Sequence, residues 1–246
     1  MCWSGEASTV LATIGFGTCA YAAYKKKPTA LWISLGYFSL MEALQAYTYS
    51  VIDQCSLPSN QIATLLGYLH IAFQPFFVNL ISMHFIPDDV RKKIQGPVYC
   101  LCFAAAIIMI LQVYPFDWAG VCTPTRPLCS KTLCSVTGSW HVAWNIPING
   151  IGNSLLNIPI VLAYIFSGAY PYTLVATVLP FIYGSWRVTL YLLLSGPLLA
   201  QLLTNNKNER PAVWCLLSAG MLLIIILTPL SNSLHVKKWL FYPKKA

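Results

Sequence analysis

Four ionisable side chains lie in long apolar stretches of a chain in which only 9% of the residues are charged: Glu42, His70, His141 and Arg187. A charge in the hydrocarbon core of a membrane is costly unless it faces a partner or a watery cavity, so each residue marks a candidate site. His70, His141 and Glu42 together could bind a divalent metal ion and leave one position open for water or substrate. Without a metal, His70 could act as a general base beside Glu42, while Arg187 stabilises a developing anion.

The metal hypothesis rests on residue types alone. The sequence contains no HxxH, HxxxH or HExxH pair, so every ligand would have to come from a different helix. The same absence sets the chain apart from the alkaline-ceramidase and progestin-receptor group of seven-helix hydrolases, in which an HxxxH pair is expected. The catalytic prediction therefore depends on the tertiary arrangement of the four residues.

Uncharged polar side chains accompany three of these residues at helical spacing. Positions three or four residues apart share one face of a helix, so these side chains are expected to line the same pocket and to bind substrate. They are Gln45 near Glu42, Gln74 near His70, and Tyr183 and Tyr191 on either side of Arg187.

A regular polar pattern surrounds the fourth residue, with one polar side chain at every fourth position. This spacing predicts a stripe along a helix that starts at the outer face. The stripe could serve only to join helices through hydrogen bonds, since each amide hydrogen bond between membrane helices stabilises their association by about 0.6 kcal/mol on average. We favour one wall of a polar cavity, because glycines and prolines interrupt the same helix. The stripe consists of His141, Asn145, Asn149, Asn153 and Asn157.

Several functions compete for this set of residues. A buried Glu42–Arg187 ion pair could serve only to fix the packing. The leading hypothesis is an enzyme that acts on a lipid or a small membrane-soluble substrate in a polar pocket in the outer half of the bilayer. The second is a transporter or channel for a small polar or anionic solute, in which Glu42 and His70 relay protons. The third is a ligand-sensing receptor.

We expect transmembrane helices to carry these residues. Hydrophobic residues make up 57% of the 246 positions, which is typical of polytopic membrane proteins. We expect an all-α bundle of seven transmembrane helices in a single domain, residues 1–246, with an outer capping loop at 115–140 and a basic tail at 232–246. Helices two, three, five and six should enclose the pocket. The apolar segments run at about 8–24, 29–51, 61–86, 97–114, 141–167, 172–203 and 211–231.

The distribution of Lys and Arg predicts the orientation, because short cytoplasmic loops are enriched in positive charge. Ten basic residues fall on one predicted face and four on the other. The amino terminus should therefore be extracellular, luminal or periplasmic, and the carboxyl terminus cytoplasmic. The ten are Lys25, Lys26, Lys27, Arg91, Lys92, Lys93, Lys237, Lys238, Lys244 and Lys245; the four are Arg126, Lys131, Lys207 and Arg210.

Four cysteines agree with this orientation. Cys55, Cys122, Cys129 and Cys134 all fall in the two loops assigned to the outer face, where an oxidising compartment allows disulfides to form. A bridge within 122–134 or to Cys55 is expected, and spacing alone leaves the pairing open. A zinc site is disfavoured, because the cysteines lack a close CxxC pair.

Other function classes find no support in the sequence. Every lysine lies in a predicted loop or terminus, which excludes a covalent retinal protein. There is no phosphate-binding loop, GxSxG motif, TVGYG-like filter or nucleic-acid motif. The expected partners are membrane lipids, including anionic headgroups near the basic tail, and a lipid or small-molecule substrate. Whether copies of the chain form a homo-oligomer is left open.

Four short motifs carry a resemblance to a known family. They are Met1-Cys2-Trp3-Ser4, Trp140-His141, Gly196-Pro197 and Trp214-Cys215. With them the chain resembles a family of polytopic microbial membrane proteins of unknown function. The resemblance covers most of the chain and implies a seven-helix body. It implies no activity and no site residue.

Overall fold

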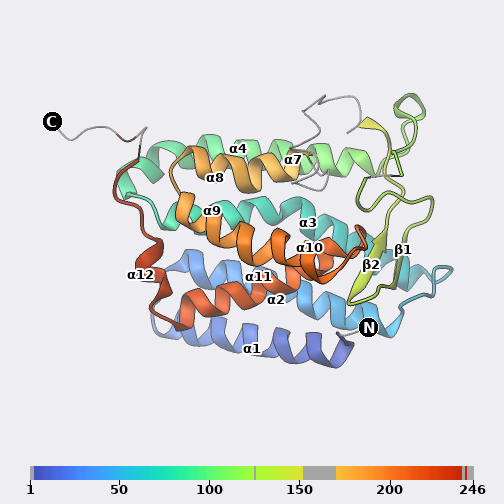
Figure 1. Ribbon diagram of the computed structural model, residues 1–246, viewed down its shortest axis with the longest axis horizontal. Helices are drawn as coiled ribbons and strands as arrows, with labels where there is room; N and C mark the ends of the chain where they lie inside the picture. Colours follow the sequence, from blue (N-terminus) through green and yellow to red (C-terminus); the bar gives the residue numbers. More distant parts are fainter. Residues whose placement is uncertain (1–2, 125, 152–169, 240–241, 243–246) are drawn as a thin grey trace.

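The amino-terminal half is a row of four helices, in which each helix packs against the next one along the chain (Figure 1). Pro28, Pro58 and Pro87 stand at the starts of the second, third and fourth helices, where a missing N–H costs no hydrogen bond. The computed structural model describes residues 3–124, 126–151, 170–239 and 242. The four helices are α1 (Gly5–Tyr24), α2 (Thr29–Ser50), α3 (Pro58–His84) and α4 (Asp88–Gln112).

The carboxyl-terminal half contains helical segments separated by turns. Pro180 and Pro197 disturb the regular hydrogen-bond ladder, and a π-helical turn lies beside the first and contains the second. The segments are α7 (Tyr170–Thr173), the π turn η2 (Leu174–Val178), α8 (Leu179–Ile182), α9 (Trp186–Leu193), the π turn η3 (Leu194–Leu198), α10 (Leu199–Leu203), α11 (Arg210–Leu227) and α12 (Leu230–Leu234).

Residues 172–203, predicted as one span, form two helices instead. The segments α7–η2–α8 and α9–η3–α10 run in opposite directions and form a hairpin, in which α8 packs against α9 next to the turn (Figure 1). The turn between them contains Gly184, whose φ of +98° lies in the region that only glycine adopts without strain. The prediction of a single helix was wrong because continuous apolar character conceals this turn.

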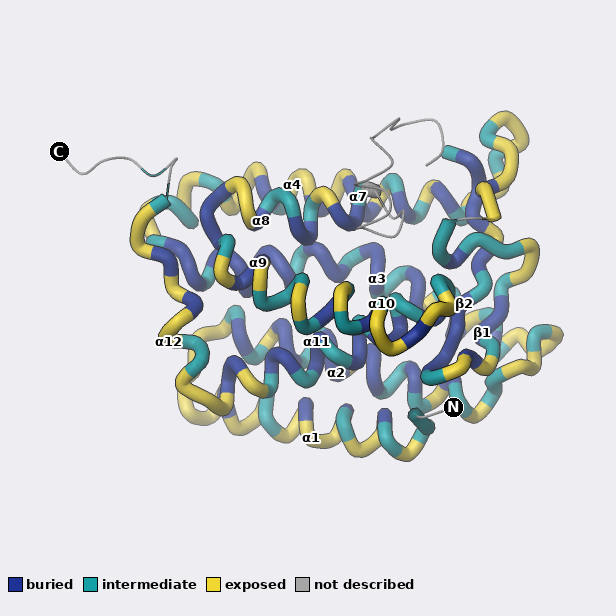
Figure 2. Tube along the Cα trace, viewed as in Figure 1, coloured by how far each residue is buried: buried dark blue, intermediate teal, exposed yellow. Residues whose placement is uncertain are grey.

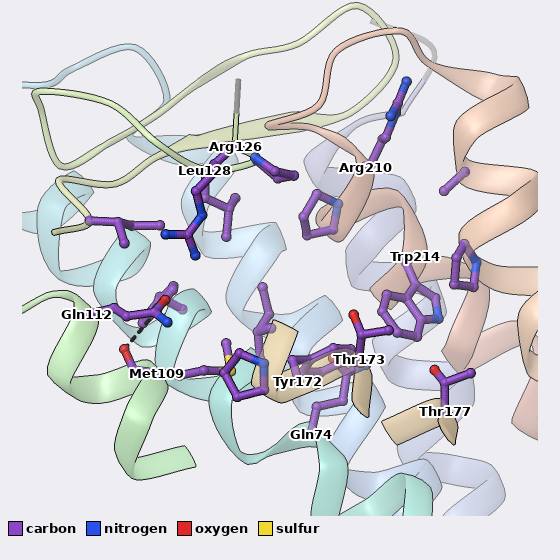
Figure 3. A pocket seen from close by; sticks show the side chains of 18 residues that line it. Gln74, Met109, Gln112, Arg126, Leu128, Tyr172, Thr173, Thr177, Arg210 and Trp214 are labelled. Carbon is purple, nitrogen blue, oxygen red and sulfur yellow. Dashed lines mark hydrogen bonds between the residues drawn. The ribbon is translucent and has the colours of Figure 1, made fainter. Parts of the chain in front are cut away.

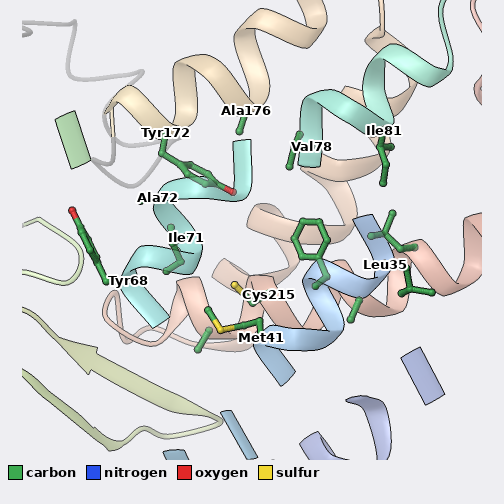
Figure 4. Close-up of a cluster of buried hydrophobic side chains, with 14 of the residues drawn as sticks. Leu35, Met41, Tyr68, Ile71, Ala72, Val78, Ile81, Tyr172, Ala176 and Cys215 are labelled. Carbon is green, nitrogen blue, oxygen red and sulfur yellow. The ribbon is translucent and has the colours of Figure 1, made fainter. Parts of the chain in front are cut away.

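Helix α11 lies at the centre of the molecule and packs against α1, α2 and the hairpin segments η3 and α10. Figure 4 shows Leu35, Met41 and Cys215 within the buried apolar cluster, together with Tyr68 and Ile71 of α3. Exposed positions, in contrast, recur along the outer faces of α1 and α4 (Figure 2). Large apolar side chains, including those of Ile14, Phe16 and Phe103, lie on these exposed faces.

A cap of residues 113–150 covers one end of the bundle. It contains the 3₁₀ turn η1 (Asp117–Ala119) and an antiparallel hairpin of β1 (Cys134–Thr137) and β2 (Val142–Asn145). Trp3 N–H donates to the Trp140 carbonyl at 3.0 Å, so the start of α1 is also at this cap end. At the opposite end, here called the tail end, Val236 N–H donates to the carbonyl of Phe85 at 2.9 Å.

The predicted fifth span, residues 141–167, does not begin as a helix. Val142, Trp144, Ile146 and Ile148 are buried and recur at every second residue, which is the period of a strand with one covered face. Residues 142–145 accordingly form β2, and the chain continues to Asn149 in extended form. The helical stripe predicted from His141 was therefore wrong in its described part. Asn153 and Asn157, which complete it, lie outside the described residues.

Two disulfides hold the cap, and they use the four cysteines predicted for the outer loops. Cys55 bonds to Cys134 and so links the α2–α3 loop to β1, while Cys122 bonds to Cys129 within the cap. Asn60 strengthens the first link, since its side-chain amide donates to the carbonyls of Val51 and Ser135 at 2.8 and 2.9 Å. The expectation of a disulfide-bonded loop is confirmed.

Four helices in the described part of the chain are long and apolar enough to cross a membrane. They are Pro58–His84, Asp88–Gln112, Trp186–Leu203 and Arg210–Leu227, and a shorter apolar helix covers Pro171–Ile182. The described architecture is predominantly helical, with a single two-stranded sheet confined to the cap.

Candidate functional site

Arg187 and Glu42 do not form the predicted pair. Arg187 is exposed at the tail end, where its guanidinium donates to the carbonyls of Ser233 and His235 at 2.8 and 3.1 Å. Glu42 is completely buried on α2 and makes no ion pair. The prediction placed Arg187 in mid-membrane because it assumed one long helix, whereas the turn at Gly184 puts Arg187 in the first turn of α9.

His70 also lies away from Glu42. Its ring stacks on Tyr37 with the ring centroids 3.9 Å apart, and it lines an apolar groove with Leu40 and Leu44 of α2. Tyr37, Leu40 and Leu44 share one face of α2, whereas Glu42 interacts with Ser8 of α1 on another face. The described residues contain no group of three or more His, Cys, Asp or Glu side chains that could hold a metal ion. The proposed metal site of Glu42, His70 and His141 is therefore not formed.

His141 lies where the cap contacts the helix bundle. Its Nδ1 lies 2.6 Å from the hydroxyl of Tyr49, near the end of α2. Its peptide N–H and that of Trp140 donate to the carboxylate of Glu209, which also accepts from the hydroxyls of Ser139 and Thr204. Burial lowers the pKa of His141 to about 3, although the Glu209 carboxylate acts to raise it. His141 is consequently neutral at physiological pH and holds the cap in place.

Most other predicted substrate-binding side chains are bonded within the protein. Asn145 accepts from the Asn208 amide at 2.9 Å, and Asn149 donates to the carbonyls of Leu111 and Tyr114. The Tyr183 hydroxyl donates to Asn79 at 3.0 Å, and that of Tyr191 donates to the Met221 carbonyl at 3.4 Å. These hydrogen bonds join the cap to α4 and to the turn before α11, and join helices to one another.

Gln74 is different, because its side-chain nitrogen is buried without a hydrogen-bond partner and lines a cavity beneath the cap. This cap cavity measures about 90 Å³. A water molecule needs about 10 to 15 Å³ of such space, so the cavity has room for a polar group of several heavy atoms. Helices α3, α4, α7, α10 and α11 and cap residues 126–128 form its walls.

Two further polar groups in the cap cavity have no hydrogen-bond partner among the residues that the structure describes. They are the Nε2 atom of Gln112 and the hydroxyl of Tyr172, and both side chains are nearly inaccessible to solvent. Figure 3 shows Gln112, Tyr172 and Gln74 around the same space, with Arg126 extending from the cap above them. The sequence did not predict Gln112 and Tyr172 as site residues. Both lie near the ends of predicted spans, where a polar side chain does not by itself indicate a site.

The cap cavity carries positive charge at its mouth. Arg126 and Arg210 contribute to its lining, and no Asp or Glu does so among the described residues. Arg210 is partly held by a hydrogen bond from its Nε to the Thr204 carbonyl at 3.2 Å. An oxygen-rich, negatively charged group would therefore find both donors and favourable electrostatics there.

Below its polar part, the cavity adjoins an apolar void. Thr177, Pro197 and Trp214 line both spaces, so the two are neighbours that share these walls. The void is about 20 Å³, and its other walls include Phe38 and Leu222 of the hydrophobic core. Hydrogen-bond donors at the cap end and apolar walls towards the interior of the bundle form an amphipathic site.

Comparison with known proteins identifies one match. A family model described as a family of unknown function (DUF5765) matches residues 6–235, which extend from the first turn of α1 to His235 beyond α12. No curated protein and no solved structure matches the chain. The predicted resemblance to an uncharacterised family is thus confirmed.

Proposed function

Since the chain belongs to the DUF5765 family, whose function is unknown, we propose from its geometry that it is an integral membrane protein that binds a lipid or small membrane-soluble molecule in the cap cavity. The ligand carries an anionic, oxygen-rich headgroup. One observation supports this most strongly: Gln74, Gln112 and Tyr172 present three buried polar groups without protein partners to one space.

The energetics favour a ligand at this position. A buried donor that lacks an acceptor destabilises a protein by about 1 to 3 kcal/mol. Carboxylate or phosphate oxygens accept hydrogen bonds from amide nitrogens and from a tyrosine hydroxyl. Arg126 above the cavity adds an attractive charge for the same oxygens. An apolar chain attached to such a headgroup would contact Thr177 and Trp214 in the cavity wall.

We place the cap on the outer side of the membrane. Its two disulfides suit an oxidising compartment, while Lys25–Lys27 and Arg91–Lys93 lie at the tail end, as expected for cytoplasmic loops. In this proposal seven helical passes cross the membrane, and the two arms of the hairpin replace the single span predicted over 172–203. The passes are α1, α2, α3, α4, α7–η2–α8, α9–η3–α10 and α11.

Ligand binding is the step that an enzyme, a transporter and a receptor share. The described lining of the cap cavity supplies hydrogen-bond donors and positive charge but no His, Cys, Asp or Glu side chain. It therefore supports recognition of a ligand more directly than turnover. The hypothesis of catalysis by Glu42 and His70 loses its geometric basis, because these residues lie on different faces of the helix pair.

The proposal is tested by ligand titration of the purified protein in nanodiscs. Oleate and lysophosphatidic acid should raise the melting temperature and appear as bound species in native mass spectra, whereas neutral monoolein should bind at least tenfold more weakly. Gln112→Leu should weaken oleate binding roughly 10- to 100-fold, since a hydrogen bond to a charged group contributes about 1.5 to 3 kcal/mol. Gln54→Leu, on an exposed loop, is the matched control.

Two results would contradict the proposal. One is equal affinity for oleate and monoolein in the wild-type protein. The other is unchanged oleate affinity in both Gln112→Leu and Tyr172→Phe, provided that the variants retain the wild-type melting temperature without ligand.

A further inference from the structure

A second polar centre lies inside the bundle, away from the cap cavity. Glu42 and Gln45 are three residues apart on α2 and are both 0% exposed. All four of their side-chain polar atoms lack a hydrogen-bond partner. A buried carboxylate with no partner is among the least stable arrangements in a protein, because its lost hydration is not replaced.

The surroundings of Glu42 supply oxygen and sulfur atoms but no positive charge. The Ser8 hydroxyl of α1, which accepts from Trp3 Nε1 at 2.8 Å, lies near the Glu42 carboxyl without forming a hydrogen bond of good geometry with it. Cys215 of α11 is close enough to interact with the carboxyl electrostatically. Tyr49, on the same helix as Glu42, also interacts with the carboxyl electrostatically, and its hydroxyl is hydrogen-bonded to His141 of the cap. No Lys or Arg in the described part of the chain forms an ion pair with Glu42.

We propose that Glu42, Gln45 and Ser8 form a binding site for sodium. The carboxylate, the amide oxygen of Gln45 and the Ser8 hydroxyl are hard oxygen donors, which suit a small, hard cation and not a soft transition metal. The single negative charge is balanced by one monovalent ion, whereas a divalent ion would leave a net positive charge inside the bundle. The ion would replace the missing partner of a carboxylate that is inaccessible to bulk water.

A sodium ion at this location would stabilise the packing of the helices. The three ligand residues lie on α1 and α2, and Cys215 beside them lies on α11. A bound ion therefore connects the first two helices at the point where they meet the central one. Because ligands that bind only the folded state stabilise it by mass action, the melting temperature should depend on the sodium concentration.

The test uses the full chain in nanodiscs of neutral lipid at pH 8 and constant ionic strength. Replacing choline chloride by sodium chloride should raise the melting temperature in a saturable manner, and equilibrium dialysis with ²²Na⁺ should give about one ion per chain. Glu42→Gln should abolish the sodium-dependent rise, and Gln45→Leu should increase the half-saturating concentration at least tenfold. Glu6→Gln, which changes an exposed carboxylate on α1, should behave as the wild type.

The proposal is overturned if the wild-type protein binds no ²²Na⁺ or melts at the same temperature in sodium and in choline. It is also overturned if Glu42→Gln keeps the full sodium response. Should Glu42→Gln fail to fold, the dialysis of the wild type and the Gln45→Leu titration still decide the matter. None of these measurements depends on oleate, so failure here leaves the ligand site of the cap cavity unaffected.

Discussion

Glu209 shows how one carboxylate can fix the cap on the bundle. It accepts hydrogen bonds from the hydroxyls of Ser139 and Thr204 and from the peptide N–H groups of Trp140 and His141. Burial alone raises the pKa of Glu209, but these four hydrogen bonds outweigh it and hold the pKa below its usual value of 4.5. The folded state therefore favours the charged carboxylate.

The lowered pKa of Glu209 predicts a specific dependence of stability on pH. Its stabilising contribution is present in full above pH 4.5 and is lost as the pH falls through the lower pKa of the folded state. Glu209→Gln should cost about 2 kcal/mol at pH 7, because a neutral amide replaces a charged acceptor. Melting temperatures between pH 7 and pH 3 should fall less steeply in the variant. Parallel curves for the two proteins would show that Glu209 does not carry this effect.

At the scale of elements, the hairpin of α7–η2–α8 and α9–η3–α10 shapes the cap cavity. Its first arm contributes Tyr172 and Thr177, and its second arm contributes Pro197. The sharp turn at Gly184 reverses the chain between the two arms, and the tail residues Trp239 and Tyr242 pack directly over that glycine. The same turn places Arg187 at the tail end.

Gly184→Ala should destabilise the hairpin by about 1 to 3 kcal/mol, since a residue with a side chain is strained at positive φ. The added Cβ would also lie 2.5 Å from the Tyr242 hydroxyl and 2.8 Å from the Trp239 ring. Thermal unfolding would measure the loss. The control is Gly17→Ala in α1, where a Cβ meets nothing within 4 Å and helix propensity improves by up to about 1 kcal/mol. Equal effects of the two substitutions would exclude strain at Gly184 as the cause.

At the scale of the whole molecule, the disulfides connect parts that are far apart in sequence. Cys55 and Cys134 are separated by 79 residues, whereas Cys122 and Cys129 are separated by 7. A crosslink that closes a longer loop removes more entropy from the unfolded chain. The long-range bridge also fastens the hairpin of the cap to the α2–α3 loop, close to the Tyr49–His141 contact.

Removing the first bridge should therefore cost more than removing the second. Cys55→Ser with Cys134→Ser should destabilise the protein by about 4 kcal/mol, and Cys122→Ser with Cys129→Ser by about 2 to 3 kcal/mol, on the chain-entropy estimate. Chemical denaturation of both double variants under non-reducing conditions gives the comparison. A larger loss from the short-range bridge would contradict this order and point to local packing in the cap.

Properties that depend on composition and local pattern could be predicted from the amino-acid sequence. Three long apolar runs correspond to α3, α4 and α11, and the four loop cysteines pair in the structure. Burial of apolar helices follows directly from the hydrophobic character of each segment, and cysteines in one compartment can pair wherever the cap brings them together. The family of unknown function also follows from the sequence.

The contacts between polar residues, in contrast, could not be predicted without the packing of the helices. Helical spacing placed Gln45 beside Glu42, but it could not show that His70 faces an apolar groove on another side of the helix pair. The chain reverses direction at Gly184, which has a positive φ, and Arg187 therefore lies at the tail end and not in the middle of a long helix. Gln74 gained its cavity neighbours Gln112 and Tyr172 because helices distant in sequence pack around one space. Local sequence specifies the face of a helix on which a side chain lies, whereas its partners depend on how all the helices turn and pack together.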